Sequence, residues 1–212
     1  FQVASAFDRA VAAGYNPQPF FALWNQGSNL PNALNQLSGE LHAAERRVLL
    51  EDTRVVRETA FDRLNAGLSA VAGQSVTTEQ GDAAITFWLR AAGAWGTAAS
   101  GDGYSRFTTE QQGLLTGLDY AKDGFKVGAM FTFTNTDAEF TSLGRSTVES
   151  TGGSVYAGYR QPDAGAVVNV GAAAAGTSAR GSRAVTVPGL AQTLTSNYDG
   201  HAWQVFGEVA YD

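Results

Sequence analysis

From residue 84 to residue 211, apolar residues alternate with small or polar ones. A period of two is typical of β-strands with two unlike faces. In one such segment, Phe125, Val127 and Phe131 share a face opposite Lys126 and Thr132. We predict six strands, at residues 84–96, 109–121, 125–140, 150–160, 165–180 and 196–211.

The connections between these strands alternate in length. Those at 121–124 and 161–164 are tight turns, whereas those at 97–108, 141–149 and 181–195 are long. Outer-membrane barrels combine short periplasmic turns with long outer loops, and a soluble sheet has no reason to alternate in this way. The pattern favours an antiparallel, up-and-down transmembrane β-barrel. The alternative is a soluble β domain, which would bury the apolar faces in its own core.

A long helical segment precedes the strands. Residues 33–68 contain no proline and consist mostly of good helix formers. Between residues 39 and 64 there are five arginines and six acidic residues, spread nearly all round the helix. This charge suits either a solvated surface helix or a helix inside a wet channel. About 28 helical residues would be about 42 Å long, enough to cross a bilayer core about 30 Å thick.

We therefore divide the chain into three parts. Residues 1–32 form a partly helical junction, residues 33–78 an α-helical linker within the pore, and residues 83–212 the N-terminal half of an outer-membrane β-barrel. Six strands leave two open edges, which are costly in lipid, so we expect further strands in the parent protein. Because the first residue is Phe1 with no signal-like segment after it, we expect a processed or excised piece.

Charged residues on the mixed strand faces are candidates for the pore wall, because a charge facing lipid is costly. The predicted pore-lining residues are Arg90, Asp119, Lys126, Arg160 and Glu208. The predicted pore-helix residues are Glu45, Arg46, Arg47, Glu51, Arg54, Arg57 and Glu58. An alternative is that the wall charges are simply solvated or pair with one another.

The composition excludes several functions. A net charge of −6 lacks the positive field of a nucleic-acid binder. The sequence contains no run of about 18 apolar residues, the length that a transmembrane helix needs. With no cysteine, only His42 and His201, and no G-x-S-x-G elbow, we predict no catalytic residue, no cofactor and no metal site.

Several motifs, taken in order, resemble those of monomeric autotransporters, the proteins of type V secretion. They are LNQLSGELHA at 34–43, LEDTR at 50–54, FDRL at 61–64, WLR at 88–90, GLDY at 117–120, YAGY at 156–159 and WQVFGE at 203–208. The resemblance implies a translocator domain, namely a 12-stranded barrel with a helix in its pore. Such a domain lies in the outer membrane of a Gram-negative bacterium and exports its upstream passenger to the cell surface.

The resemblance also implies partners, which are the protein's own N-terminal passenger, outer-membrane lipid, the barrel-assembly machinery and periplasmic chaperones. The sequence departs from the family by stopping after about six strands, without the terminal strand that ends in an aromatic residue. Some autotransporters cut their own linker through an Asn side chain. Here there is no Asn-Asn pair, and only Asn65 lies near the end of the helix.

Two other barrel functions remain open. One is a porin-like or ligand-binding barrel without a secretion role, which has no need of a helix before its first strand. The other is a barrel enzyme such as a protease or phospholipase, for which His201 alone is too little.

Overall fold

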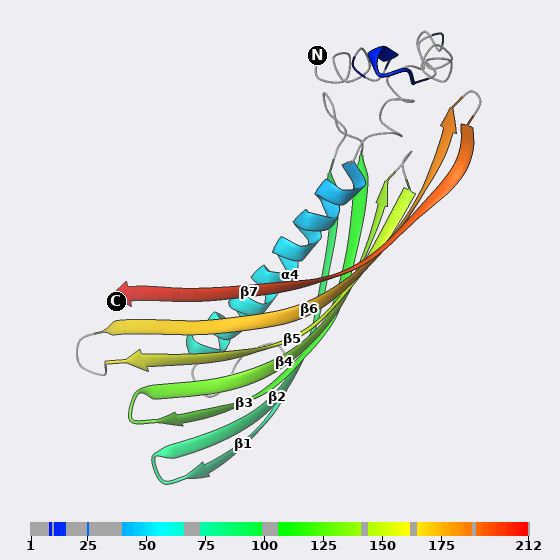
Figure 1. Cartoon of the computed structure of the whole chain (residues 1–212). Helices are drawn as coiled ribbons and strands as arrows, with labels where there is room; N and C mark the ends of the chain where they lie inside the picture. The colour runs from blue at the N-terminus through cyan, green and yellow to red at the C-terminus, as the bar shows by residue number, and fades with distance from the viewer. Residues whose placement is uncertain are drawn as a thin grey trace.

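The computed structural model describes residues 9, 11–15, 25, 40–65, 73–98, 106–140, 144–161, 165–187 and 190–211. Their principal elements are one long helix and seven strands (Figure 1). The helix is α4 (Glu40–Asn65). The strands are β1 (Gln74–Gln80), β2 (Ala83–Ala98), β3 (Phe107–Lys122), β4 (Phe125–Phe140), β5 (Gly144–Arg160), β6 (Ala166–Val187) and β7 (Leu190–Tyr211).

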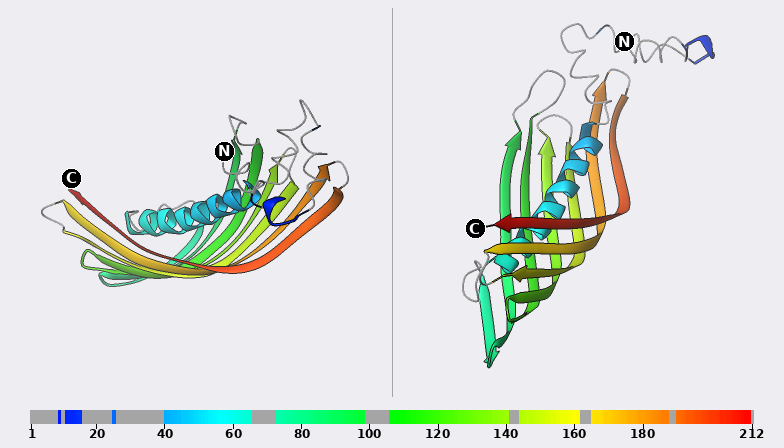
Figure 2. Two further views of the ribbon diagram at one scale, coloured as in Figure 1. Left: turned by 45° about the horizontal axis from the view of Figure 1, so that its top comes forward. Right: turned by 90° about the vertical axis from the view of Figure 1, so that its left-hand side faces the viewer.

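The strands form one antiparallel sheet in which each strand pairs with the next along the chain, in the order β1 to β7. The sheet is strongly curved, and α4 lies against its concave side (Figure 2). The sheet is open, with β1 at one edge and β7 at the other. The predicted antiparallel, up-and-down architecture preceded by a helix is confirmed.

All six predicted strands are present, but the prediction missed β1. This strand begins inside residues 33–78, which we predicted to be helical, and ends at Gln80, whereas α4 ends at Asn65. The sequence of β1, QSVTTEQ, is polar and mostly exposed, so it has no apolar alternation by which to recognise it. Residues 33–39 and 66–72 lie outside the described part of the chain.

Two of the three loops predicted to be long, 141–149 and 181–195, are also wrong in extent, because much of each is strand. β5 begins at Gly144, and β6 and β7 together take up nearly all of residues 181–195. These stretches contain Val, Thr and Leu, which favour strands, and their polar residues lie on a strand face rather than in a loop. β6 and β7 each continue about five residues beyond the last pair with β5, which joins Arg145 to Ser182.

The tight turn predicted at 121–124 is present, whereas residues 162–164 of the second predicted turn lie outside the described part of the chain. β3 and β4 are joined at Asp123 and Gly124, whose φ angles of 49° and 79° are both positive. Two positive φ values in succession are the mark of a type I′ hairpin turn, whose twist suits the flanking strands. The hairpin register is therefore fixed locally at this end of the sheet.

The two faces of the sheet differ as the alternation predicts. Residues on the concave face are buried against α4, and their neighbours in the chain lie exposed on the convex face. Large apolar residues exposed on the convex face include Phe87, Leu118, Phe131, Val155, Val170 and Val205. Among the residues that the structure describes, no helix is long and apolar enough to cross a membrane.

Glycines on the concave face make room for aromatic rings. Trp88 is paired across the strands with Gly117, and Phe206 with Gly171. A Cβ at Gly171 would lie 2.4 Å from the Phe206 ring, so only glycine fits beneath that ring. Together with Tyr156, Leu115 and Met130, these rings form the apolar floor on which the C-terminal half of α4 rests.

Candidate functional site

The contact between α4 and the concave face of the sheet is the candidate functional site. One side of α4 is buried there, at positions spaced by three or four residues as one face of a helix requires. The residues of this buried stripe are Val48, Asp52, Val56, Thr59, Ala60 and Arg63. The other side of α4 is exposed and charged, and there Arg54 bonds Glu58 at 2.7 Å and Glu51 at 3.3 Å.

Near the C-terminal end of α4, a single carboxylate collects donors from three elements. Both Nε, at 2.7 Å, and Nη2 of Arg63 donate to Oδ2 of Asp119. Oδ1 accepts hydrogen bonds from Trp88 Nε1, at 3.3 Å, and from the Tyr156 hydroxyl. The side chains of Arg63 and Asp119 are only 8% and 2% exposed. A buried charge is tolerated when it is paired and hydrogen-bonded in this way.

Two further basic residues of the sheet bind the same end of the helix. Lys126 Nζ donates to the main-chain carbonyl of Arg63, one of the last four carbonyls of α4, which have no partner within the helix. Arg90 Nη1 lies 2.8 Å from Asp62 Oδ2 and 3.4 Å from Thr59 Oγ1. The sheet therefore supplies positive charge at the negative end of the helix dipole.

Asn65 ends the helix against β6 and β7. Its side-chain Nδ2 donates to Glu208 Oε2 at 3.2 Å, and its side-chain Oδ1 accepts a hydrogen bond from Asn169 Nδ2 at 2.8 Å. Asn169 also donates to Glu208, at 3.3 Å. These three side chains close a small polar triangle at the last turn of α4.

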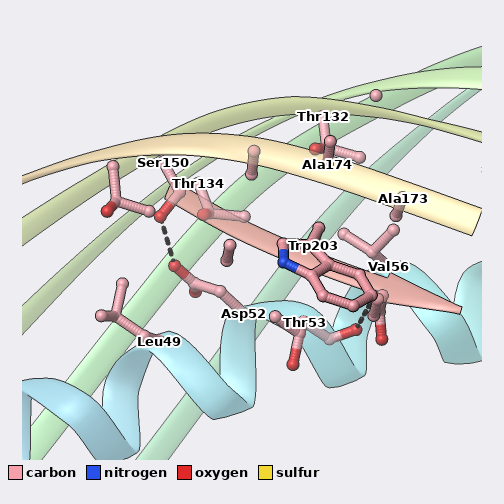
Figure 3. A pocket seen from close by; sticks show the side chains of 15 residues that line it. Leu49, Asp52, Thr53, Val56, Thr132, Thr134, Ser150, Ala173, Ala174 and Trp203 are labelled. Carbon is pink, nitrogen blue, oxygen red and sulfur yellow. Dashed lines mark hydrogen bonds between the residues drawn. The ribbon is translucent and has the colours of Figure 1, made fainter. Parts of the chain in front are cut away.

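A second carboxylate, Asp52, is buried higher on the helix. It accepts hydrogen bonds from Ser150 Oγ, at 2.6 Å, and from Gln111 Nε2. Thr134 lies beside this contact (Figure 3). Unlike Asp119, Asp52 has uncharged donors in both of these contacts. Beside Asp52, a pocket of only about 30 Å³ separates the helix from β4 to β7, so the fit leaves little room for water on that side. Toward β2 and β3, a larger space of about 260 Å³ lies next to Val48 and Glu51.

The structure brings four of the five predicted wall residues to the helix. Arg90, Asp119 and Lys126 contact its last turns, and Glu208 contacts its final residue. The fifth, Arg160, lies at the end of β5 with an exposed side chain, and its main-chain N–H donates to Gly124.

The predicted pore-helix residues lie mainly on the side of α4 away from the sheet. Arg46, Glu51, Arg54 and Glu58 are exposed, and Arg57 is half-buried. Glu45 and Arg47 belong to α4, but their side chains lie outside the described part of the structure.

The helix residues that contact the wall most closely, Asp52 and Arg63, were not singled out. Counting charges around a helix does not show which way it is rotated. The signal that could have found them is their helical spacing with Val48 and Val56.

Metal binding has no support in the described ranges, where no three His, Cys, Asp or Glu side chains come together. His201 is exposed on β7, and the side chain of His42 lies outside the described part. The contacts found between helix and sheet are packing, hydrogen bonds and ion pairs, which serve to hold the helix in place.

Comparison with known proteins agrees with this architecture. The family model described as the autotransporter β-domain matches residues 87–212, which is more than half of the chain. Two extracellular serine proteases of Serratia marcescens are 26% and 27% identical to it over 133 and 130 residues. These matches cover 62% and 61% of this chain but only 12% of each protease.

A structural likeness to the ferric yersiniabactin uptake receptor FyuA of Yersinia pestis is weak. Its TM-score is 0.34 and its identity 14%, over 64% of this chain and 24% of the receptor. This likeness adds nothing to the assignment. The family model, the meander of strands and the helix on their concave face agree with one another, and the chain belongs to the autotransporter β-domain family.

Proposed function

We propose that this chain is the translocator part of an autotransporter, which anchors in the outer membrane and carries the passenger upstream of it to the cell surface. The observation that carries the proposal is the position of α4, bound through Asp119 and Asp52 to the concave face of a sheet whose convex face is apolar. A charged helix on the inner wall and apolar residues on the outer wall suit a water-filled barrel in lipid.

The width of the apolar band supports a membrane position. On β4, outward-facing apolar residues run from Phe125 to Phe133. Nine residues at about 3.4 Å each, tilted by about 40°, span roughly 23 Å, close to the apolar band of about 25 Å in outer-membrane barrels. Tyr120, Tyr159 and Tyr211 lie exposed near the tight-turn end, as in an aromatic girdle.

The direction of α4 supports export. Its N-terminal part packs at Val48 against Phe140 and Val148, at the end of the sheet away from the tight turns. Its C-terminal end binds Glu208, near the tight turns. If the tight turns are periplasmic, the chain before α4 leaves the barrel on the outer side.

We propose the partners of the domain on the same grounds. The passenger is attached before α4, and lipid covers the convex face. The open edges at β1 and β7 need further strands, because unpaired backbone groups are costly in a bilayer. We include the barrel-assembly machinery and periplasmic chaperones as the partners that would bring such a barrel to its membrane. The catalytic activity named for the Serratia relatives would belong to a passenger and not to this domain.

A porin-like or ligand-binding barrel is the weaker alternative. It would need an open lumen, whereas the contacts of Arg63, Asp52 and Asn65 hold a helix against the inner wall.

Export is tested with an epitope tag placed before Phe1 in a complete autotransporter that carries this chain. The tag should be cleaved by protease added to intact cells. A second tag in the turn at Asp123 and Gly124 is the matched control and should be cleaved only after permeabilisation. A first tag that also needs permeabilisation would show that the passenger is not exported.

A further inference from the structure

We infer that alternating apolar and polar layers between α4 and the sheet fix the height and the rotation of the helix, and so determine where the exported chain stops. This inference rests on the proposed placement of α4 in the lumen. It assigns Asp52 and Arg63 as positioning residues, which act by selecting one register of the helix.

Four layers follow one another along the buried stripe of α4. First, Val48 packs among Ala138, Phe140, Val148 and Ala179. Second, Asp52 binds Gln111 and Ser150. Third, Val56 and Ala60 pack among Leu115, Met130, Tyr156 and Phe206. Fourth, Arg63 binds Asp119. Asp52 and Arg63 are eleven residues apart, which is about 16 Å along the axis and close to the same side of the helix.

A shift of one helical turn would mismatch every layer. Moving α4 along its axis by four residues, away from the tight turns, would put Asp52 in the apolar layer of Phe140 and Val148. The same movement would put Val56 against Gln111 and Ser150. Moving it inward would put Val48 in the polar layer. In both cases Asp119 would lose Arg63 and keep a buried charge without its counter-ion, which is strongly unfavourable.

Rotation is opposed as well. Glu51, Arg54 and Glu58 are exposed, and turning α4 by one residue would bring such charges to the wall. The buried hydroxyls of Thr134 and Thr136 lie near the Asp52 carboxylate, the acceptor toward which they can donate in the native register. Both lie on the concave face of β4, in the same polar layer as Asp52, where an apolar side chain would leave these hydroxyls without an acceptor.

The two polar layers differ in chemistry, which gives a way to tell them apart. The two side chains bonded to Asp52 are neutral, so an asparagine can still accept a hydrogen bond there. Asp119 faces a guanidinium, so the fourth layer depends on charge. We therefore expect Asp52→Asn to preserve the register.

The register can be read by crosslinking engineered cysteine pairs, because the chain has no cysteine of its own. Gln204 Nε2 donates to the carbonyl of Thr53 at 2.7 Å, so these two positions are neighbours. In the complete autotransporter, Gln204→Cys is combined in turn with Thr53→Cys, Leu49→Cys or Arg57→Cys. Because the Gln204 side chain spans the gap between the two backbones, the pairs are joined with a short bifunctional thiol reagent, which reaches beyond the Cα separation of about 7 Å that a direct disulfide allows. One helical turn of about 5.4 Å separates the three positions on α4. The first pair reports the native register, and the other two report displacement by one turn.

With an unaltered stripe, only the Thr53 pair should crosslink efficiently. In the variant Asp52→Leu with Arg63→Leu, three registers of the helix should have similar free energy. The crosslink yield of the Thr53 pair should then fall to about one third of its value, while the yields of the Leu49 and Arg57 pairs rise. Asp52→Leu alone should give a smaller shift in the same direction. The matched control is Arg46→Leu, on the exposed side of α4 and outside the stripe, and it should leave the native yield unchanged.

An unchanged Thr53 yield in both Leu variants would overturn the inference and leave the proposed function standing. Absence of crosslinks at all three positions in the unaltered stripe would overturn the placement of α4 itself. Surface exposure of the passenger, measured on the same cells, would then separate this result from a failure of export.

Discussion

Asp119 is the residue on which the helix contact depends most. Its two carboxylate oxygens accept hydrogen bonds from Arg63, Trp88 and Tyr156, and the guanidinium of Arg63 also lies 5.2 Å from the Trp88 ring centre. Each partner comes from a different element, so this one side chain joins α4, β2, β3 and β5. A charge in such a position is costly to leave without its partner.

We therefore predict that Asp119→Ala destabilises the domain by about 3 kcal/mol, because Arg63 would keep a buried charge. The free energy of unfolding can be measured by urea titration of the assembled barrel in lipid vesicles. Glu110→Gln, which changes an exposed acid on the same strand, should change it by less than about 0.5 kcal/mol.

The same pair allows a second prediction. Replacing both partners, by Asp119→Leu with Arg63→Met, should recover only part of the stability lost in Asp119→Ala, because no uncompensated arginine charge remains but Trp88 Nε1 and the Tyr156 hydroxyl lose their acceptor. Additive losses in the double variant would mean that the two side chains act independently and that the buried ion pair is not the main contribution.

At the scale of elements, strand pairing depends on where side chains are missing. Gly171 lies beneath the Phe206 ring, and a Cβ there would come within 2.4 Å of two ring atoms. We predict that Gly171→Ala costs about 1–3 kcal/mol, as overpacking does. Gly176→Ala on the same strand is the control, since its nearest neighbour would lie at 3.9 Å. Equal unfolding free energies for the two variants would contradict the prediction.

The elements also show what the sequence could and could not predict. Strands with an apolar face, such as β4, were predicted because apolar residues of the convex face and mixed residues of the concave face alternate strictly along them. β1 was missed because both of its faces are polar and exposed. The outer ends of β6 and β7 were taken for a loop because their alternation is weaker there than in the apolar band.

At the site, the wall charges could be predicted because Asp119, Lys126 and Glu208 all fall on the mixed faces. Their partners on the helix could not, because charge surrounds α4 and only packing decides its rotation. Asp52 and Arg63 lie in one buried stripe with Val48 and Val56. Because this stripe mixes charged and apolar residues, it does not stand out in the sequence as an apolar face does.

At the scale of the whole molecule, the convex band determines how the domain sits in a membrane. Phe131 lies near the middle of the band and is 53% exposed. We predict that Phe131→Arg destabilises the barrel by about 2–4 kcal/mol and lowers the amount assembled in the outer membrane. Gln112→Arg, on the convex face above the band, should have little effect. Equal assembly of the two variants would contradict a lipid-facing band.

Closure of the pore can be tested at the same scale. If α4 fills the lumen, removing residues 40–65 should raise the ion conductance of the completed barrel in a planar bilayer several-fold. The variant Glu51→Gln with Glu58→Gln retains the helix and should conduct like the parent. A conductance that does not change on deletion would place α4 outside the lumen.

The extra length of β6 and β7 gives the barrel mouth an uneven height. Five residues beyond the last pair with β5, at about 3.3 Å each, carry this hairpin roughly 16 Å past the neighbouring strand. On the proposed export route, a chain that leaves beside α4 would pass this hairpin last. The hairpin would then be the first surface of the domain that a newly exported segment meets as it begins to fold.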